Sequence, residues 1–294
     1  MNHVYRSHAF LIITALIAGF NYTISKLVMP TYMQPEAIVV VRVILAAAFF
    51  WLVDTIVLRE KIDFKRDFIR IALCAFFGVG ANQILFYMGL NLTSPINASL
   101  MMTICPVLVL IVSAILIKER ITITKVLGIG VGALGACTLL LSSHGSDAKG
   151  MFLGDFMIFM NAACYAVFLV LVKPLLTRYN ALTIAKWMFL TGCFIIVPFG
   201  YDELMETNWE VIPQFALWSL AYIVVFNTIV AYYLNINVMK YVNASVAGIY
   251  IYFQPMLATI IAISFGKDVL TKEKVFSSLL IFAGVFLVSR KSKG

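Results

Sequence analysis

Ten long apolar runs divide this chain of 294 residues and limit its possible folds more than any other feature. They cover residues 9–29, 37–57, 67–89, 96–117, 122–141, 151–173, 181–200, 213–237, 243–265 and 274–290. A helix needs about 20 mostly apolar residues to cross a hydrocarbon core of about 30 Å. Backbone groups in lipid must be hydrogen-bonded within a helix or a closed barrel, and these runs lack the period-two alternation of a barrel. We therefore expect an all-α polytopic membrane protein with ten transmembrane helices.

The composition and the distribution of charge support this expectation. Hydrophobic residues make up 62% of the chain and charged residues 12%, whereas soluble domains have about half and about a quarter. The net charge is +8, but between the spans the basic residues favour the side that carries the N-terminus by fifteen to four. Because cytoplasmic loops show this bias, we expect both termini to be cytoplasmic and expect no nucleic-acid partner.

The cysteines and histidines do not have the spacing of a metal or redox site. The five cysteines lie inside the spans without a CxxC pair, and the three histidines lie in loops or near span ends. We therefore expect no metal and no other cofactor.

The two halves of the chain match each other. At an offset of 149 residues, Pro106 falls on Pro255 and Gly135 on Gly284. Lys26 falls on Lys173 at an offset of 147, and Arg42 falls on Lys186 at 144. Insertions in the loops would explain these small changes of offset. Residues 9–141 and 151–290 therefore form two five-span repeats. Because five is odd, the second repeat starts on the opposite side of the membrane and runs inverted, which is typical of transporters.

The fifth span contains a glycine pattern with two possible meanings. Gly130, Gly132 and Gly135 form GxGxxG, but no strand precedes them, so a dinucleotide site is disfavoured. Gly128, Gly132 and Gly135 instead form a small-residue stripe that lets helices approach closely. We expect the fifth and tenth spans to be packing helices that contact neighbours or, in a homodimer, a second protomer.

Polar side chains gather in the first, third, fourth, sixth, eighth and ninth spans and are almost absent from the fifth and tenth. Since lipid exposure of such groups is costly, we expect them to face a central cavity that binds a small-molecule substrate. The candidate substrate-binding residues are Asn21, Tyr22, Gln83, Tyr87, Asn97, Met101, Asn161, Tyr165, Tyr232, Asn235, Tyr250 and Gln254. Some pairs are equivalent in the two repeats, such as Gln83 with Tyr232. The alternative is that these groups form interhelical hydrogen bonds, worth about 0.6 kcal/mol each.

Three cations lie within spans: Lys26, Arg42 and Lys186. Each could extend its charge to the interface, or they could act as gates that attract an anionic group at the two mouths of the pathway. No Asp or Glu lies deep in a span, so a carboxylate relay for protons is not evident, which favours facilitated diffusion or exchange.

Two prolines stand at equivalent points of the fourth and ninth spans. Pro106 and Pro255 each remove a backbone hydrogen bond near mid-membrane. They are candidate hinges whose freed carbonyls could bind substrate, or they are simply tolerated kinks.

The sequence resembles the drug/metabolite transporter superfamily, specifically proteins with two EamA-type domains. The matching stretches are GFNYTISK (19–26), Arg42, SPINASLMMTICPV (94–107), KER (118–120), GDFMIFMNAACYAVFLVLVK (154–173), ASVAGIYIYFQPMLA (244–258) and GKD (266–268). The resemblance covers nearly the whole chain. It departs from the usual pattern at Asp268, where Glu is common, and at Tyr165, where Trp is common, so the substrate cannot be carried over from the family.

The resemblance implies a central cavity formed by spans one to four and six to nine. It also implies export or facilitated movement of small metabolites, commonly amino acids, across the bacterial cytoplasmic (inner) membrane. We expect a secondary transporter that works by alternating access in the lipid bilayer. A channel-like or structural membrane protein without a carrier cycle is the alternative. An enzyme is not expected, because the buried residues offer no nucleophile with a base and no metal cluster.

Overall fold

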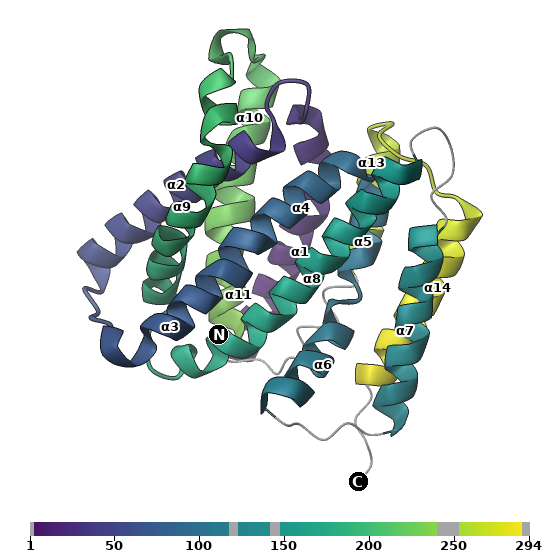
Figure 1. Cartoon of the computed structure of the whole chain (residues 1–294), viewed down its shortest axis with the longest axis horizontal. Helices are drawn as coiled ribbons and strands as arrows, with labels where there is room; N and C mark the ends of the chain where they lie inside the picture. Colours follow the sequence, from purple (N-terminus) through teal and green to yellow (C-terminus); the bar gives the residue numbers. More distant parts are fainter. Residues whose placement is uncertain (1–2, 118–122, 142–147, 240–252, 290–294) are drawn as a thin grey trace.

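The computed structural model describes residues 3–117, 123–141, 148–239 and 253–289, and every regular element in these ranges is a helix (Figure 1). In the first half the helices are α1 (His3–Val28), α2 (Pro35–Val57), α3 (Phe64–Ala75), η1 (Phe76–Gly80), α4 (Ala81–Leu92), α5 (Pro95–Met102), α6 (Cys105–Ile117) and α7 (Ile123–Leu141). In the second half they are α8 (Ala148–Leu176), α9 (Ala181–Glu206), η2 (Trp209–Val211), α10 (Gln214–Tyr222), η3 (Ile223–Val230), α11 (Ala231–Met239), α13 (Phe253–Ser264) and α14 (Lys272–Ser289). The predicted all-α class is confirmed for these ranges.

Seven helical runs of the described chain are long and apolar enough to cross a membrane. They cover Ala9–Val28, Pro35–Val57, Phe64–Leu92, Pro95–Leu116, Lys149–Leu176, Ala181–Glu206 and Gln214–Val238. Two shorter apolar helices, Ile123–Leu139 and Gln254–Ser264, belong to the fifth and ninth predicted spans. The number of ten spans stays a prediction, because residues 240–252, where the ninth would begin, lie outside the described ranges.

The surface of the helices carries large apolar side chains. Ile123 is 81% exposed and Phe194 77%, and Leu134 and Phe286 are also exposed. Contiguous apolar surface is rare on soluble monomers. In a bilayer, by contrast, such side chains face the lipid tails while the backbone stays bonded within its helix. The surface therefore fits a protein that spans a membrane several times.

Local sequence signals fix several helix starts. Ser94 precedes α5, where its hydroxyl accepts a hydrogen bond from the Asn97 backbone N–H at 3.3 Å, and Pro95 takes the first helical position. Asn180 caps α9 in the same way, with its side-chain oxygen 3.1 Å from the Leu182 nitrogen. Such residues satisfy backbone N–H groups that have no partner within the helix.

The fourth span is broken in its middle. α5 ends at Met102 and α6 begins at Cys105, directly before Pro106. The backbone N–H groups of Thr103 and Ile104 donate to the carbonyls of Leu100 and Met101 at 3.0 and 3.2 Å. In a regular helix the residue at 106 would donate to the Met102 carbonyl, but Pro106 has no N–H to do so. Substrate binding by this freed carbonyl and the role of Pro106 as a hinge both stay predictions.

Two π-helical segments, which the sequence analysis did not anticipate, interrupt the third and eighth spans. They are η1 at residues 76–80 and η3 at residues 223–230. At the offset of 149 residues that relates the two halves, 76–80 falls on 225–229, which lies inside η3. π-Helical turns disturb the regular hydrogen-bond ladder and are frequent at functional sites. The irregular turns thus occur at matching points of the two halves.

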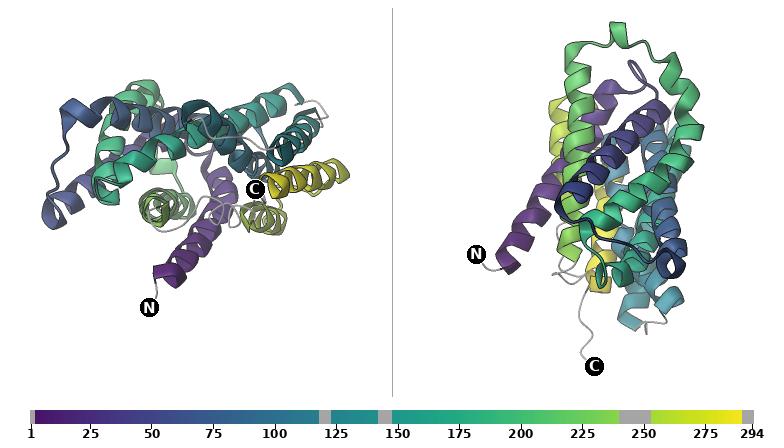
Figure 2. Two further views of the ribbon diagram at one scale, coloured as in Figure 1. Left: turned by 90° about the horizontal axis from the view of Figure 1, so that it is seen from below. Right: turned by 90° about the vertical axis from the view of Figure 1, so that its left-hand side faces the viewer.

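The principal helix contacts join one half of the chain to the other. α7 packs on α14, α2 on α9, α4 on α8 and α1 on α13. Figures 1 and 2 show α7 and α14 side by side at one edge of the bundle, while α1, α4, α8 and α11 gather around its middle. The two halves are therefore interleaved rather than separate, and the space between them lies at the centre.

Glycines allow the close contact of α7 and α14. A Cβ atom added to Gly284 would lie 2.4 Å from the Gly132 nitrogen and 2.7 Å from the Gly128 oxygen, and one added to Gly135 would lie 2.8 Å from the Ile281 nitrogen. Around Gly130, outside this stripe, nothing lies within 4 Å. The packing role of the stripe is confirmed within the chain, and these faces are not available to a second protomer. A homodimer through these helices stays a prediction.

Candidate functional site

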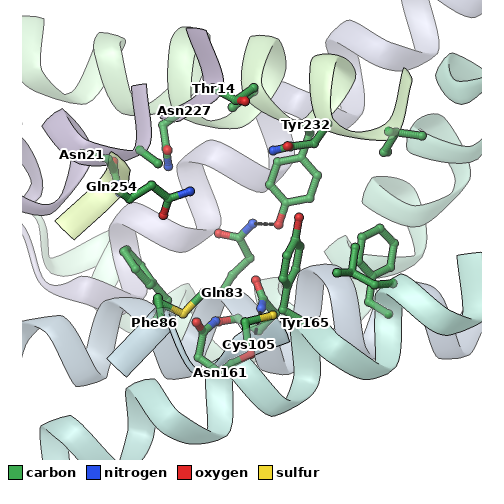
Figure 3. A pocket seen from close by; sticks show the side chains of 18 of the residues that line it. Thr14, Asn21, Gln83, Phe86, Cys105, Asn161, Tyr165, Asn227, Tyr232 and Gln254 are labelled. Atoms are coloured by element: carbon green, nitrogen blue, oxygen red, sulfur yellow. Dashed lines mark hydrogen bonds between the residues drawn. The ribbon is translucent and has the colours of Figure 1, made fainter. Parts of the chain in front are cut away.

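A cavity of about 200 Å³ lies at the centre of the bundle (Figure 3). Its described lining consists of Leu11, Thr14, Ala18, Asn21, Tyr22, Arg42, Asn82, Gln83, Phe86, Met102, Cys105, Asn161, Tyr165, Phe168, Leu169, Asn227, Ala231, Tyr232, Asn235, Ile236, Val238 and Gln254. Both halves of the chain contribute, whereas α7 and α14 give no residue to this lining. The volume is below the range of about 300–1,000 Å³ that is typical of sites for drug-sized ligands, so the cavity suits a small molecule.

Eight of the twelve predicted substrate-binding residues line this cavity. They are Asn21, Tyr22, Gln83, Asn161, Tyr165, Tyr232, Asn235 and Gln254. Figure 3 shows Gln83 near the centre and pointing toward Tyr232, with Asn21 and Gln254 on one side. The structure thus brings together residues that are up to 233 positions apart in the sequence. That they bind a substrate stays a prediction.

Three other predicted residues do not line the cavity. The hydroxyl of Tyr87, which is fully buried, donates to Asn21 Oδ1 at 3.4 Å, so Tyr87 supports the wall from behind. Asn97 Nδ2 donates to Asp155 Oδ2 at 3.0 Å, away from the cavity. Met101 is fully buried in the apolar core. Apolar spans alone do not fix how far each helix is rotated about its axis, so these three residues lie outside the described lining, and a role for them in substrate binding stays a prediction.

Two predicted residues of the ninth span are not tested. Tyr250 lies outside the described residues. Pro255 is buried at the third position of α13, but the chain before Phe253 is outside the described ranges. Its role as a hinge therefore stays a prediction.

Gln83 and Tyr232 connect the two halves inside the cavity. Gln83 Nε2 donates to the Tyr232 hydroxyl at 2.5 Å, and this hydroxyl donates to the carbonyl of Gly78 in η1 at 2.8 Å. The two residues are 149 positions apart, the offset that relates the halves. Residues that are equivalent under a two-fold operation and also touch must lie near its axis.

A second link joins α4 to α8. Asn82 Nδ2 donates to the carbonyl of Asn161 at 3.2 Å, and Asn161 Nδ2 donates to the carbonyl of Asn82 at 2.6 Å. The side-chain oxygen of Asn161 is buried and has no hydrogen-bond partner in the described structure. A buried acceptor without a donor is unfavourable by about 1–3 kcal/mol, and a ligand in the cavity could relieve this cost.

Arg42 lies in the cavity wall and is only 2% exposed. Its Nε donates to the Thr228 hydroxyl at 2.8 Å, and its guanidinium carbon lies 4.6 Å from the centre of the Tyr87 ring. Thr228 in turn donates to the Ile223 carbonyl, five residues earlier in η3, at 2.8 Å. Extension of Arg42 to an interface is therefore wrong, because its side chain lines the central cavity.

Lys186 lies in a closed contact between α2 and α9. Its ammonium forms an ion pair with Asp54, which also accepts a hydrogen bond from Thr183 Oγ1 at 2.7 Å. The rings of Trp51 and Trp187 lie 4.9 and 5.4 Å from the ammonium. The expectation that Lys186 attracts an incoming anion is corrected, because its charge already has a partner within the chain.

Lys26 also lies outside the cavity wall. Its ammonium donates to the Asn91 carbonyl at 2.8 Å, where α1 meets the end of α4. Nearby, Asp268 forms an ion pair with Lys274 at 2.6 Å and accepts a hydrogen bond from the Ile96 backbone N–H at 3.0 Å. These polar contacts join α1 to α4, and α5 to the α13–α14 turn.

The sequence analysis missed several residues of structural or functional interest. Asp54 and Asp155 lie near the ends of apolar runs, where exposure to water is expected, but both are fully buried and hydrogen-bonded. Thr14, Asn82 and Asn227 also line the cavity; they belong to the polar residues within apolar runs that the sequence indicates, but they are not among the twelve candidates. The apolar wall residues Leu11, Phe86, Met102, Cys105, Phe168 and Leu169 carry no such signal. In sequence they resemble residues that face lipid.

Neither a metal cluster nor an acidic wall residue occurs in the described parts of the chain. A search of these parts finds no group of three His, Cys, Asp or Glu side chains that could hold a metal ion. The cavity wall consists of amides, tyrosines, apolar side chains and one cation, as far as it is described. Such a wall can orient a small polar molecule through hydrogen bonds while it packs against an apolar part of that molecule.

Comparisons with known proteins agree with this architecture. The sequence profile of the EamA-like transporter family matches residues 6–141 and 152–290. An uncharacterized transporter of Archaeoglobus fulgidus is 25% identical over 96% of this chain and 98% of its own length. A probable terminal-alkyne amino-acid exporter of Streptantibioticus cattleyicolor is 24% identical over 78% of this chain and 75% of its own length. A solved crystal structure superposes with a TM-score of 0.64 at 16% identity, over 96% of this chain and 97% of its own, and shows the same fold.

Proposed function

The chain belongs to the EamA-like transporter family, and from this premise we propose that it is a secondary transporter of small metabolites such as amino acids. In this proposal it works by alternating access around the central cavity. The single observation that supports the proposal most directly is the contact of Gln83 with Tyr232, because two residues at matching positions of the halves meet in the cavity wall. Movement of the halves against each other would then expose the same groups to either side of the membrane.

The proposed architecture consists of two inverted repeats of five helices, at residues 9–141 and 151–290, with ten membrane spans. The helix pairs that join the halves and the matching positions of η1 and η3 support it. In this topology both termini are cytoplasmic and the bacterial inner membrane is the site of action. Single cysteines placed at residues 145 and 292 should then be labelled from opposite sides of the membrane. Labelling of both from one side would contradict the inverted repeat.

The chemistry of the wall supports a small polar substrate with an apolar part. Amide side chains such as Asn21 and Asn235 offer both donors and acceptors, and Phe86 and Phe168 offer apolar surface. An amino acid combines these properties. The Streptantibioticus relative is a probable terminal-alkyne amino-acid exporter, which points in the same direction.

The alternative is a channel-like or structural membrane protein without a carrier cycle. Proteoliposomes loaded with unlabelled amino acids separate the two, because a carrier exchanges internal for labelled external substrate and saturates, whereas a channel does not show counterflow. We expect saturable counterflow with at least one amino acid. Tyr232→Phe removes only the hydroxyl that contacts Gln83 and Gly78, so we expect slower exchange. Unchanged exchange in Tyr232→Phe would remove this contact from the transport cycle.

A further inference from the structure

The buried cations of the described chain differ in whether they form an ion pair. Lys186 is paired with Asp54 and Lys274 with Asp268. Arg42 is the most deeply buried of the three, and in the described structure it has no ion pair and one hydrogen bond, to the neutral hydroxyl of Thr228. We propose that Arg42 binds the carboxylate of the transported molecule, so that the substrates of this protein are small carboxylates. This assignment rests on the proposed transport function.

The chemistry of arginine makes the unpaired charge significant. A guanidinium stays protonated in proteins and carries five N–H donors in a rigid plane. Only the Nε donor of Arg42 has an acceptor in the described residues. A buried charge without a counter-charge is costly, and water or a ligand must compensate it. Arg42 lines the cavity, so a molecule inside the cavity can supply that compensation.

The contacts of Arg42 hold it ready for a carboxylate. Thr228 takes the Nε–H, and the Tyr87 ring lies 4.6 Å from the guanidinium carbon. With Nε engaged, the two terminal nitrogens form the remaining edge of the plane. Two parallel N–H donors on such an edge match the two oxygens of a carboxylate, which gives strong and directional binding.

The rest of the described wall also favours a carboxylate over a cationic amine. No Asp or Glu belongs to the lining as described, so the one charge that a cationic amine without a carboxylate would meet in this wall is that of Arg42, which repels it. Neutral oxygens remain for other groups of the substrate, and Asn161 Oδ1 is buried without a donor. An amino acid would place its carboxylate on Arg42 and could direct its ammonium to such oxygens. A simple carboxylate would need only Arg42.

The test compares matched compounds in proteoliposomes. The first panel contains the twenty common amino acids, lactate and butyrate, and the second contains the corresponding carboxamides and the amines that lack the carboxyl group. Each compound is used labelled, to measure its own exchange, and unlabelled, as a competitor. We expect saturable exchange of at least one carboxylate. We also expect its carboxamide and its amine to compete at least ten times more weakly. Equal competition by the carboxamide or the amine would overturn the assignment of Arg42.

Variants distinguish binding from folding. We expect Arg42→Gln to raise the KM for the transported carboxylate at least tenfold, and Arg42→Lys, which keeps the charge without the planar fork, to raise it less. Lys173→Gln removes an exposed cation outside the cavity and should behave as the wild type. Size-exclusion profiles and thermal midpoints verify that each variant is folded. An unchanged KM in folded Arg42→Gln would overturn the proposal.

The experiment distinguishes failure of the Arg42 assignment from failure of the proposed transport function. Exchange of carboxamides or amines without any carboxylate would leave the carrier function standing and overturn the role of Arg42. Absence of saturable exchange for both panels in the wild type would overturn the proposed function, and the assignment of Arg42 with it.

Discussion

Arg42 and Lys186 stand at matching positions of the two halves, but the structure gives them opposite surroundings. Lys186 meets Asp54 and Thr183 in a closed contact between α2 and α9. Arg42 meets the hydroxyl of Thr228 and the Tyr87 ring at the edge of the cavity. One carboxylate accounts for the difference, because Asp54 neutralises Lys186 and nothing described neutralises Arg42. In the proposed assignment, the same position serves packing in one half and ligand binding in the other.

The strongest test of this comparison is Lys186→Met. The substitution leaves Asp54 buried without a cation, and removal of one partner of a buried ion pair costs about 3–5 kcal/mol. We expect a clear loss in the free energy of unfolding, measured by circular dichroism during SDS titration. The double variant Lys186→Met, Asp54→Leu should recover more than half of the loss. A single variant as stable as the wild type would show that the pair contributes little.

The next largest loss of stability is expected for Thr183, the second partner of the Asp54 carboxylate. Thr183→Val removes the hydroxyl that donates to Asp54 at 2.7 Å. Hydrogen bonds to charged groups contribute about 1.5–3 kcal/mol, so we expect the same titration to show a smaller loss than for Lys186→Met. Thr177→Val, at an exposed position, serves as the matched control. An equal change in both variants would contradict the role assigned to Thr183.

A smaller loss of stability is expected for Thr228, which holds Arg42, the cation without an ion pair in the described structure. Thr228→Val removes the hydroxyl that accepts from Arg42 Nε and donates to the Ile223 carbonyl. A neutral hydrogen bond contributes about 1 kcal/mol to stability. We expect a modest loss of stability and a several-fold rise in the KM for the transported carboxylate, because Arg42 loses its fixed orientation. A change in the maximal rate alone would show that Thr228 does not position Arg42.

The smallest effect on stability is expected for Arg42→Gln. The variant loses the hydrogen bond to Thr228 and the contact with the Tyr87 ring, but it also removes an unpaired buried charge, and the loss and the gain oppose each other. We expect a change of less than about 1 kcal/mol in the unfolding titration, in contrast to Lys186→Met. A loss as large as that of Lys186→Met would mean that Arg42 is a structural residue.

Much of the site could be predicted from the sequence, for a physical reason. Gln83, Asn161 and Tyr232 are polar residues in apolar helices, and such residues avoid lipid. The offset of 149 residues also identified Gln83 and Tyr232 as counterparts before any geometry was known. Tyr87 and Asn97 obey the same rule without lining the cavity, because a polar group can equally satisfy itself against a neighbouring helix.

The sequence alone determined the helical class, the apolar spans and the relation between the halves. These follow from the length and periodicity of apolar runs, since lipid forces each backbone segment to satisfy its own hydrogen bonds. Only the tertiary structure decided that Lys186 faces Asp54 and that Arg42 faces the cavity. The rotation and crossing of helices set these contacts through side-chain packing between segments far apart in the chain. A single sequence does not contain that geometry in readable form, so the two cations look alike until the helices are assembled.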